Sequence, residues 1–237
     1  MEPADPVLLE SPVLRAAWDT LRPSEYTAAL IQALLGRPAT VAGARVLEIG
    51  SGSGVILAAL SRLHPAALCG VDTEEAAIEA GEALMRHLGV SAEFFRGELW
   101  APVEGRRFDL IISNLPHFPT EAERFPGRLP SWSRGGQNGR RYLDPFLAGL
   151  SAHLAPTGRA VIAHNAFVGL DQTRRQLAQA GFAATILSTT LLALPEYKLA
   201  AMSPSVRARE DGRTIFSFGS HSFAEMHILD IARSESV

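Results

Sequence analysis

Two short segments of this chain carry polar residues in patterns that suit ligand binding. The first runs from Gly50 to Gly54, in which glycine alternates with serine directly after an apolar run that contains Glu48. Glycine lets the backbone lie against a ligand and adopt positive φ angles, so a strand, a glycine loop and a helix indicate nucleotide binding. The alternating glycines fit the dinucleotide spacing G-x-G-x-x-G poorly. A plain turn between strand and helix is the structural alternative.

Acidic residues recur at the ends of apolar runs. Asp72 lies 20 residues after Gly52, where a carboxylate accepts hydrogen bonds from a ribose diol. Its alternative role is to cap the next helix. Glu98 is expected either to face the adenine edge or to lie in a solvated turn. Glu48 is expected to orient the glycine loop or to bind a ligand amine, because an unpaired buried carboxylate is costly.

The second segment is Asn114-Leu115-Pro116-His117, which follows the apolar run 108–113. A turn with Asx-type bonding is its structural alternative. Three further groups of residues are candidates. Arginines 134, 140 and 141 are expected in a solvated loop or on a substrate carboxylate, and Trp132 and Tyr26 are expected to stack on a ligand or to pack under a loop. The pairs His164-Asn165 and Tyr197-Lys198 are candidates for the edge of the pocket.

These segments must be positioned by alternating strands and helices. The apolar runs predict strands at 44–49, 67–72, 92–95, 108–113, 159–165 and 185–194, with 213–218 and 225–231 as a terminal hairpin or a seventh strand. Helices are predicted at 23–36, 55–60, 73–88, 142–154 and 170–180, and residues 118–141 are predicted to be a long connection. This order indicates a mainly parallel sheet covered on both faces, with ligands beyond the carboxyl ends of its strands. The acids, the glycine loop and Asn114 are therefore expected at one edge of that sheet.

Composition narrows the class of protein further. The 237 residues predict one catalytic domain at 41–237, preceded by a helical extension or lid at 1–40. No apolar run is long enough to cross a membrane, the start lacks the order of a signal peptide, and Cys69 is the sole cysteine. These features favour the cytoplasm. The net charge of −3 argues against a phosphate-tracking surface, and the histidines show no metal-ligand spacing, so neither nucleic acid nor a metal is expected.

The ordered set of motifs resembles the class I S-adenosylmethionine (SAM) methyltransferases, and most of all the HemK-type and "small" methyltransferases. The likeness covers residues 22–165 and includes segments 23–27, 70–76, 97–100, 108–114 and 135–139. It implies a Rossmann-like, seven-stranded, mostly parallel sheet with helices on both faces. It implies SAM as cofactor, bound by Glu48, Gly50, Ser51, Gly52, Gly54, Asp72, Thr73, Glu98, Leu99 and Asn114.

The resemblance also implies a reaction. In the family, the fourth strand ends in Asn-Pro-Pro-Tyr, whose Asn side chain and neighbouring carbonyl hold an N–H₂ group for in-line attack on the sulfonium methyl. Catalysis is thereby assigned to Asn114, Leu115, Pro116 and His117, with His117 stacking on the target. The chain departs at two positions: Leu115 restores a backbone N–H, and His117 is a smaller ring that can carry a proton.

The residues of these motifs do not identify the acceptor of the methyl group. Because only about 40 residues precede the first strand, we expect a small-molecule acceptor, enclosed by residues 1–27 and 118–141. The alternatives are glutamine methylation in a protein, cyclisation of SAM with release of methylthioadenosine, and a non-catalytic SAM-binding protein. Nucleic-acid methylation is less favoured. The sequence does not predict an oligomeric state.

Overall fold

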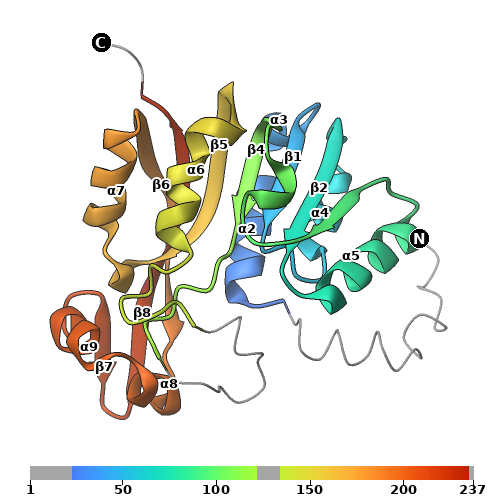
Figure 1. Ribbon diagram of the computed structural model, residues 1–237. Coiled ribbons are helices and arrows are strands. Elements are labelled where there is room, and N and C mark those ends of the chain that lie inside the picture. Colours follow the sequence, from blue (N-terminus) through green and yellow to red (C-terminus); the bar gives the residue numbers. More distant parts are fainter. Residues whose placement is uncertain (1–22, 122–133, 235–237) are drawn as a thin grey trace.

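The computed structural model describes residues 23–121 and 134–234, which form one mixed sheet flanked by helices (Figure 1). Residues 1–22 of the predicted extension and Trp132 lie outside the described residues, and the division at residue 40 stays a prediction. The strands are β1 (Arg45–Ile49), β2 (Ala67–Asp72), β3 (Glu93–Arg96), β4 (Phe108–Ser113), β5 (Leu154–Asn165), β6 (Phe182–Ala193), β7 (Ile215–Phe218) and β8 (His221–Arg233).

The strand order explains where a ligand can bind. It is β3-β2-β1-β4-β5-β8-β6, with β7 also paired to β8. The five strands from β3 to β5 are parallel neighbours, while β8 runs antiparallel to β5, β6 and β7. The order reverses direction between β1 and β4, and ligands of such sheets bind in the crevice outside the carboxyl ends at that point.

Helices cover both faces because successive strand residues point to opposite sides. Val46 packs into the cluster under α2, α4 and α5, whereas Leu47 packs into the cluster under α6 and α7. The helices are α2 (Glu25–Leu35), α3 (Pro38–Val41), α4 (Val55–Ser61), α5 (Glu75–Leu88), α6 (Leu143–His153), α7 (Leu170–Gln179), α8 (Glu196–Ala201) and α9 (Pro204–Glu210), with 3₁₀ turns η2 (Ala101–Val103) and η4 (Ala166–Val168).

The carboxyl-terminal part differs from the expected seven strands. The two candidate segments of the tail form both β7 and β8, so the sheet has eight strands within the described residues. The prediction also placed no helix between residues 194 and 214, where α8 and α9 form a small lobe beside the ends of β7 and β8 (Figure 1). These helices have only six and seven residues, so too few turns are present for periodicity to reveal them, although Leu199 and Val206 pack against the core.

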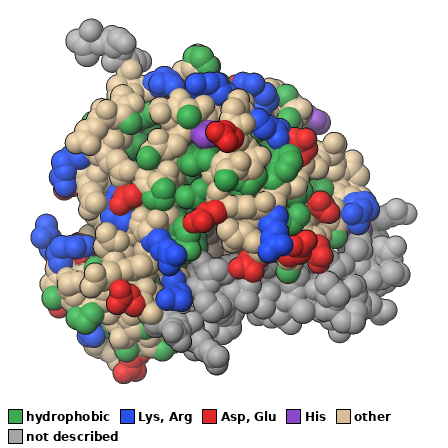
Figure 2. All heavy atoms as spheres, in the orientation of Figure 1, with side chains coloured by type: hydrophobic (Ala, Val, Ile, Leu, Met, Phe, Trp, Pro, Cys, Tyr) green, Lys and Arg blue, Asp and Glu red, His purple; other side chains and the backbone are tan. Residues whose placement is uncertain are grey.

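The surface carries charge of both signs. On the face drawn in Figure 2, acidic and basic side chains are interspersed, and neither sign covers the face. None of the helices in the described ranges is long and apolar enough to cross a membrane.

Candidate active site

A cavity of about 430 Å³ opens where β1, β2 and β4 end. It collects residues from the loop before α2 up to α8, although these are far apart in the sequence. The predicted site residues in its wall are Glu48, Gly50, Ser51, Gly52, Asp72, Thr73, Glu98, Leu99, Asn114, Leu115, Pro116 and His117. Gly54 does not line it: a Cβ there would lie 3.1 Å from the Phe94 ring and 3.2 Å from the Cα of Gly81, so this glycine permits close packing behind the loop.

The glycine loop has the backbone conformation that only glycine adopts without strain. Gly50 and Gly52 have φ angles of 74° and 51°. A Cβ on Gly52 would meet no atom within 4 Å, so the space beside this residue is open to a ligand. The Gly50 and Ser51 amides donate to the Val71 carbonyl, which ties the loop to β2.

Asp72 holds the glycine loop from the end of β2. Its carboxylate accepts hydrogen bonds from the Gly52 amide at 2.8 Å and the Glu74 amide at 3.0 Å. Burial raises the pKa of Asp72, and these two amides oppose that rise. The N-cap position of α5 belongs to Glu74. Asp72 therefore orients the loop, and it also lines the cavity, where its role in holding a ribose diol stays a prediction.

Two buried polar groups in the cavity wall lack partners among the described residues. They are one carboxylate oxygen of Glu48 and the hydroxyl of Ser51. Burial raises the pKa of Glu48 well above its usual range, and the nearby charge of Asp72 raises it further. Unsatisfied groups of this kind are costly, so they mark where a ligand donor fits. A ligand ammonium group would satisfy the Glu48 oxygen.

The loop after β4 has a fixed internal geometry. The Nδ1 atom of His117 lies 2.6 Å from the Leu115 carbonyl oxygen, and the Asn165 amide donates to Nε2 at 3.3 Å. Because Nε2 accepts, the proton sits on Nδ1 and is donated to Leu115. Burial lowers the pKa of His117 to about 4. The ring is therefore neutral, and both of its nitrogens are engaged.

Helix α2 completes the wall beside His117. Tyr26 meets the His117 ring edge to face, with centroids 5.8 Å apart, and its hydroxyl donates to the Asn165 side chain at 2.9 Å. Both Tyr26 and Asn165 line the cavity. His164 does not: its buried ring bonds to Thr173 at 2.9 Å. Cys69 packs in the core, where burial raises its pKa to about 11.

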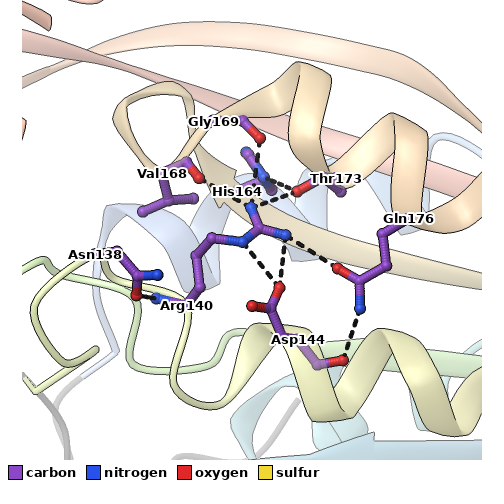
Figure 3. A network of polar contacts seen from close by, with 8 residues as sticks. All are labelled: Asn138, Arg140, Asp144, His164, Val168, Gly169, Thr173 and Gln176. Carbon is purple, nitrogen blue, oxygen red and sulfur yellow. Dashed lines mark hydrogen bonds and ion pairs between the residues drawn. The ribbon is translucent and has the colours of Figure 1, made fainter. Parts of the chain in front are cut away.

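Arg140 corrects an expectation from the sequence, because it lies neither in solvent nor on a ligand. Its buried guanidinium binds Asp144 and Gln176 and donates to the Val168 carbonyl at 2.9 Å and to Thr173 at 2.9 Å (Figure 3). It thus fastens the segment before α6 to the start of α7. The partners lie up to 36 residues away in sequence. Only the i,i+4 spacing between Arg140 and Asp144 could have predicted one of these contacts from the sequence. Arg141, by contrast, is exposed and lines the cavity.

Comparisons with known proteins agree with this geometry. The model of the "Methyltransferase small domain" family matches residues 24–125. A putative protein N5-glutamine methyltransferase from Methanocaldococcus jannaschii is 33% identical over 138 residues, which are 58% of this chain and 70% of that protein. A release factor glutamine methyltransferase from Gloeobacter violaceus is 32% identical over 66% of this chain and 57% of its own length. The chain thus spans little more than half of this second relative.

A solved structure supports the fold alone. The Mtq2–Trm112 complex of E. cuniculi, described as methylating the eRF1 termination factor, aligns with a TM-score of 0.60 and 17% identity. The alignment covers 91% of this chain and 99% of that one. Strand order, glycine loop and these matches define a class I SAM-dependent methyltransferase. Within that class, the chain belongs to the HemK-like branch.

The cavity suits the cofactor of this family, which is SAM. The open backbone at Gly52 and the unpaired Glu48 oxygen fit an adenosyl ligand with an ammonium group. The assignment of individual residues to that ligand stays a prediction. Among the described residues, no group of three or more His, Cys, Asp or Glu side chains gathers as a metal site.

The expected small-molecule acceptor is wrong. The relatives found are named for methylating glutamine in proteins, including release factors. The prediction took the short segment before the first strand as a measure of acceptor size. Helix α2 instead forms part of the cavity wall through Tyr26, so the length of that segment says little about what enters.

Proposed function

We propose that this enzyme transfers the methyl group of SAM to the side-chain nitrogen of a glutamine in a protein. The observation that carries the proposal is that Asn114, Leu115, Pro116 and His117 share one cavity with the glycine loop and Asp72. The glutamine-methylating relatives support the choice of acceptor.

Bound SAM would supply an electrophilic methyl group on a sulfonium. Glu48, the backbone of the glycine loop and Asp72 would hold it, and Asn114 would hold the acceptor. An amide nitrogen is a weak nucleophile because its lone pair is delocalised, so positioning is the main contribution of the protein. Two acceptors on its N–H groups turn the lone pair towards the methyl. The Asn114 side chain provides one acceptor.

The Leu115 carbonyl provides the second acceptor. His117 already donates to it, but a carbonyl oxygen has two lone pairs, so one remains for the substrate. As the N–C bond forms and the C–S bond breaks, the nitrogen must release a proton. His117 does not take it, because its ring nitrogens are engaged and its pKa is about 4. The proton leaves to water at the open side of the cavity.

The test is a methyl-transfer assay with SAM and a glutamine-containing protein or peptide, followed by mass spectrometry. We expect one added methyl on the glutamine side chain and equal amounts of S-adenosylhomocysteine. Asn114→Ala should lower the rate about a hundredfold, while Asp109→Asn, an exposed residue paired with Arg45, should keep it.

Three outcomes would contradict the proposal. Release of methylthioadenosine from SAM without an acceptor would favour cyclisation, and binding of SAM without any product would favour a non-catalytic protein. Methylation of the same peptide after its glutamine is replaced would show that another group is the acceptor.

A further inference from the structure

The lobe between β6 and β7 is joined to the loop that carries the catalytic candidates. The hydroxyl of Thr120 donates to the Ala201 carbonyl at 2.7 Å, and the Ser203 amide donates to the Pro119 carbonyl at 2.8 Å. These bonds hold α8 against the segment that follows His117. As a result, Lys198 of α8 lines the cavity.

A second cation reaches the cavity from the same side. Arg141 lies in the wall, with its guanidinium 5.4 Å from the centroid of the Tyr142 ring. Its segment packs on the same loop, since a Cβ on Gly139 would lie 2.6 Å from the His117 carbonyl oxygen. The segments that carry Arg141 and Lys198 therefore both pack against the loop that follows β4.

The acidic residues of the cavity lie on the opposite side. Glu48 and Asp72 come from β1 and β2, and Glu98 follows β3. In the order β3-β2-β1-β4-β5, this places the acids on one half of the sheet and the cations beyond the other half. The acidic half holds the glycine loop. The basic half borders Asn114, where the acceptor would enter.

We propose that Arg141 and Lys198 select protein acceptors in which an acidic side chain lies close to the methylated glutamine. This rests on the proposed function and adds the substrate class. A guanidinium fork binds a carboxylate with two parallel hydrogen bonds, which sets orientation as well as affinity. Lys198 has no such planar fork, so Arg141 carries the larger share.

A peptide carboxylate fits better than a nucleic-acid phosphate. The relatives act on glutamine in proteins. The chain has a net charge of −3, whereas phosphate-tracking proteins have a basic excess. Two cations in the wall of one cavity also suit a single carboxylate group more than a repeating backbone.

The experiment compares glutamine peptides that differ only at one neighbouring residue, which is Glu, Gln or Lys. We expect the Glu peptide to have the highest kcat/KM, through a lower KM. Arg141→Gln should lower kcat/KM for this peptide about tenfold, with a smaller loss for Lys198→Gln, and should leave the Gln peptide unchanged. Arg141→Lys should restore part of the selectivity. Arg207→Gln, an exposed arginine of α9 outside the cavity wall, is the matched control.

The outcomes separate this inference from the proposed function. Equal rates for the Glu and Gln peptides, or an equal loss on both in Arg141→Gln, would overturn the inference while glutamine methylation stands. If no glutamine peptide is methylated but an RNA is, and Arg141→Gln slows that reaction, both would be overturned. Calorimetry with S-adenosylhomocysteine checks that each variant keeps its cofactor site.

Discussion

The Nδ1 atom of His117 lies 2.6 Å from the carbonyl oxygen of Leu115, two residues earlier in the same loop. This contact converts the histidine of the altered motif into a structural part of the loop. Where a tyrosine would leave the neighbouring carbonyl free, the imidazole donates its proton to it. The backbone amide of Asn165 donates to Nε2, so the ring has one tautomer. The ring is neutral near neutral pH and takes no part in proton transfer there.

The buried state of His117 makes the fold sensitive to acid. Its pKa is about 4 in the folded protein, against an ordinary value of about 6.5, so the unfolded chain binds the proton more tightly between these values. Stability should therefore fall as the pH drops from 6.5 towards 4, by about 2 kcal/mol between pH 7 and 5 from this residue. Burial also lowers the pKa of His164, which adds in the same direction.

Urea unfolding at several pH values checks this. His117→Gln keeps an acceptor for the Asn165 amide but carries no titrating group, so its stability should depend less on pH than that of the wild type. An unchanged dependence would show that His117 is not the group responsible.

The buried guanidinium of Arg140 should contribute strongly to stability. Arg140→Met would leave the Val168 carbonyl and the Thr173 hydroxyl without this donor, and we expect a loss of about 3 kcal/mol. Arg141→Met, one residue later and exposed, should change the free energy of unfolding by less than about 0.5 kcal/mol. Similar values for the two variants would contradict the role of the Arg140 network.

Gly139 is a position where a single methyl group should disturb the site. Its φ is 78°, and a Cβ would lie 2.6 Å from both the His117 carbonyl oxygen and a Val168 methyl carbon. Gly139→Ala should lower stability by about 2 kcal/mol or more and slow methyl transfer. Gly212→Ala, also at positive φ but with no atom within 4 Å, should cost about 1 kcal/mol and leave transfer intact. Thermal unfolding and the transfer assay measure both effects.

Asp72 should link the glycine loop to cofactor affinity. Asp72→Asn replaces an acceptor of the Gly52 or Glu74 amide by a donor, so we expect S-adenosylhomocysteine to bind about ten- to a hundredfold more weakly. Asp109→Asn breaks the exposed pair with Arg45 and should leave the affinity unchanged. Isothermal titration calorimetry measures the affinity of both variants for S-adenosylhomocysteine. Equal affinities would show that Asp72 does not contribute to binding of this ligand.

The sequence predicted the parts of the fold that follow from local pattern. The runs 67–72 and 108–113 form β2 and β4 with the expected bounds, and the two tail segments form the expected hairpin. Because parallel strands end at one edge, the positions of Asp72 and Asn114 around one cavity also followed from strand order alone. These inferences needed only periodicity and the geometry of a parallel sheet.

Long-range contacts explain what the sequence did not predict. Arg140 looked like a loop residue because its partners come from η4 and α7, which no local pattern connects to it. The tautomer of His117 depends on the Asn165 amide, 48 residues later. Helices α8 and α9 are too short to give a clear period, so the sequence named Arg141 and Lys198 as candidates but did not show that they share one side of the cavity.

The hydrogen bond from Tyr26 to Asn165 joins residues separated by 139 positions. A nascent chain that has reached only β4 already contains the glycine loop, yet it lacks the strand that anchors Tyr26. Loop closure over such distances is slow and comes late in folding. The wall opposite the glycine loop is therefore completed only after the chain has been made through β5, and the cation from α8 is added later still.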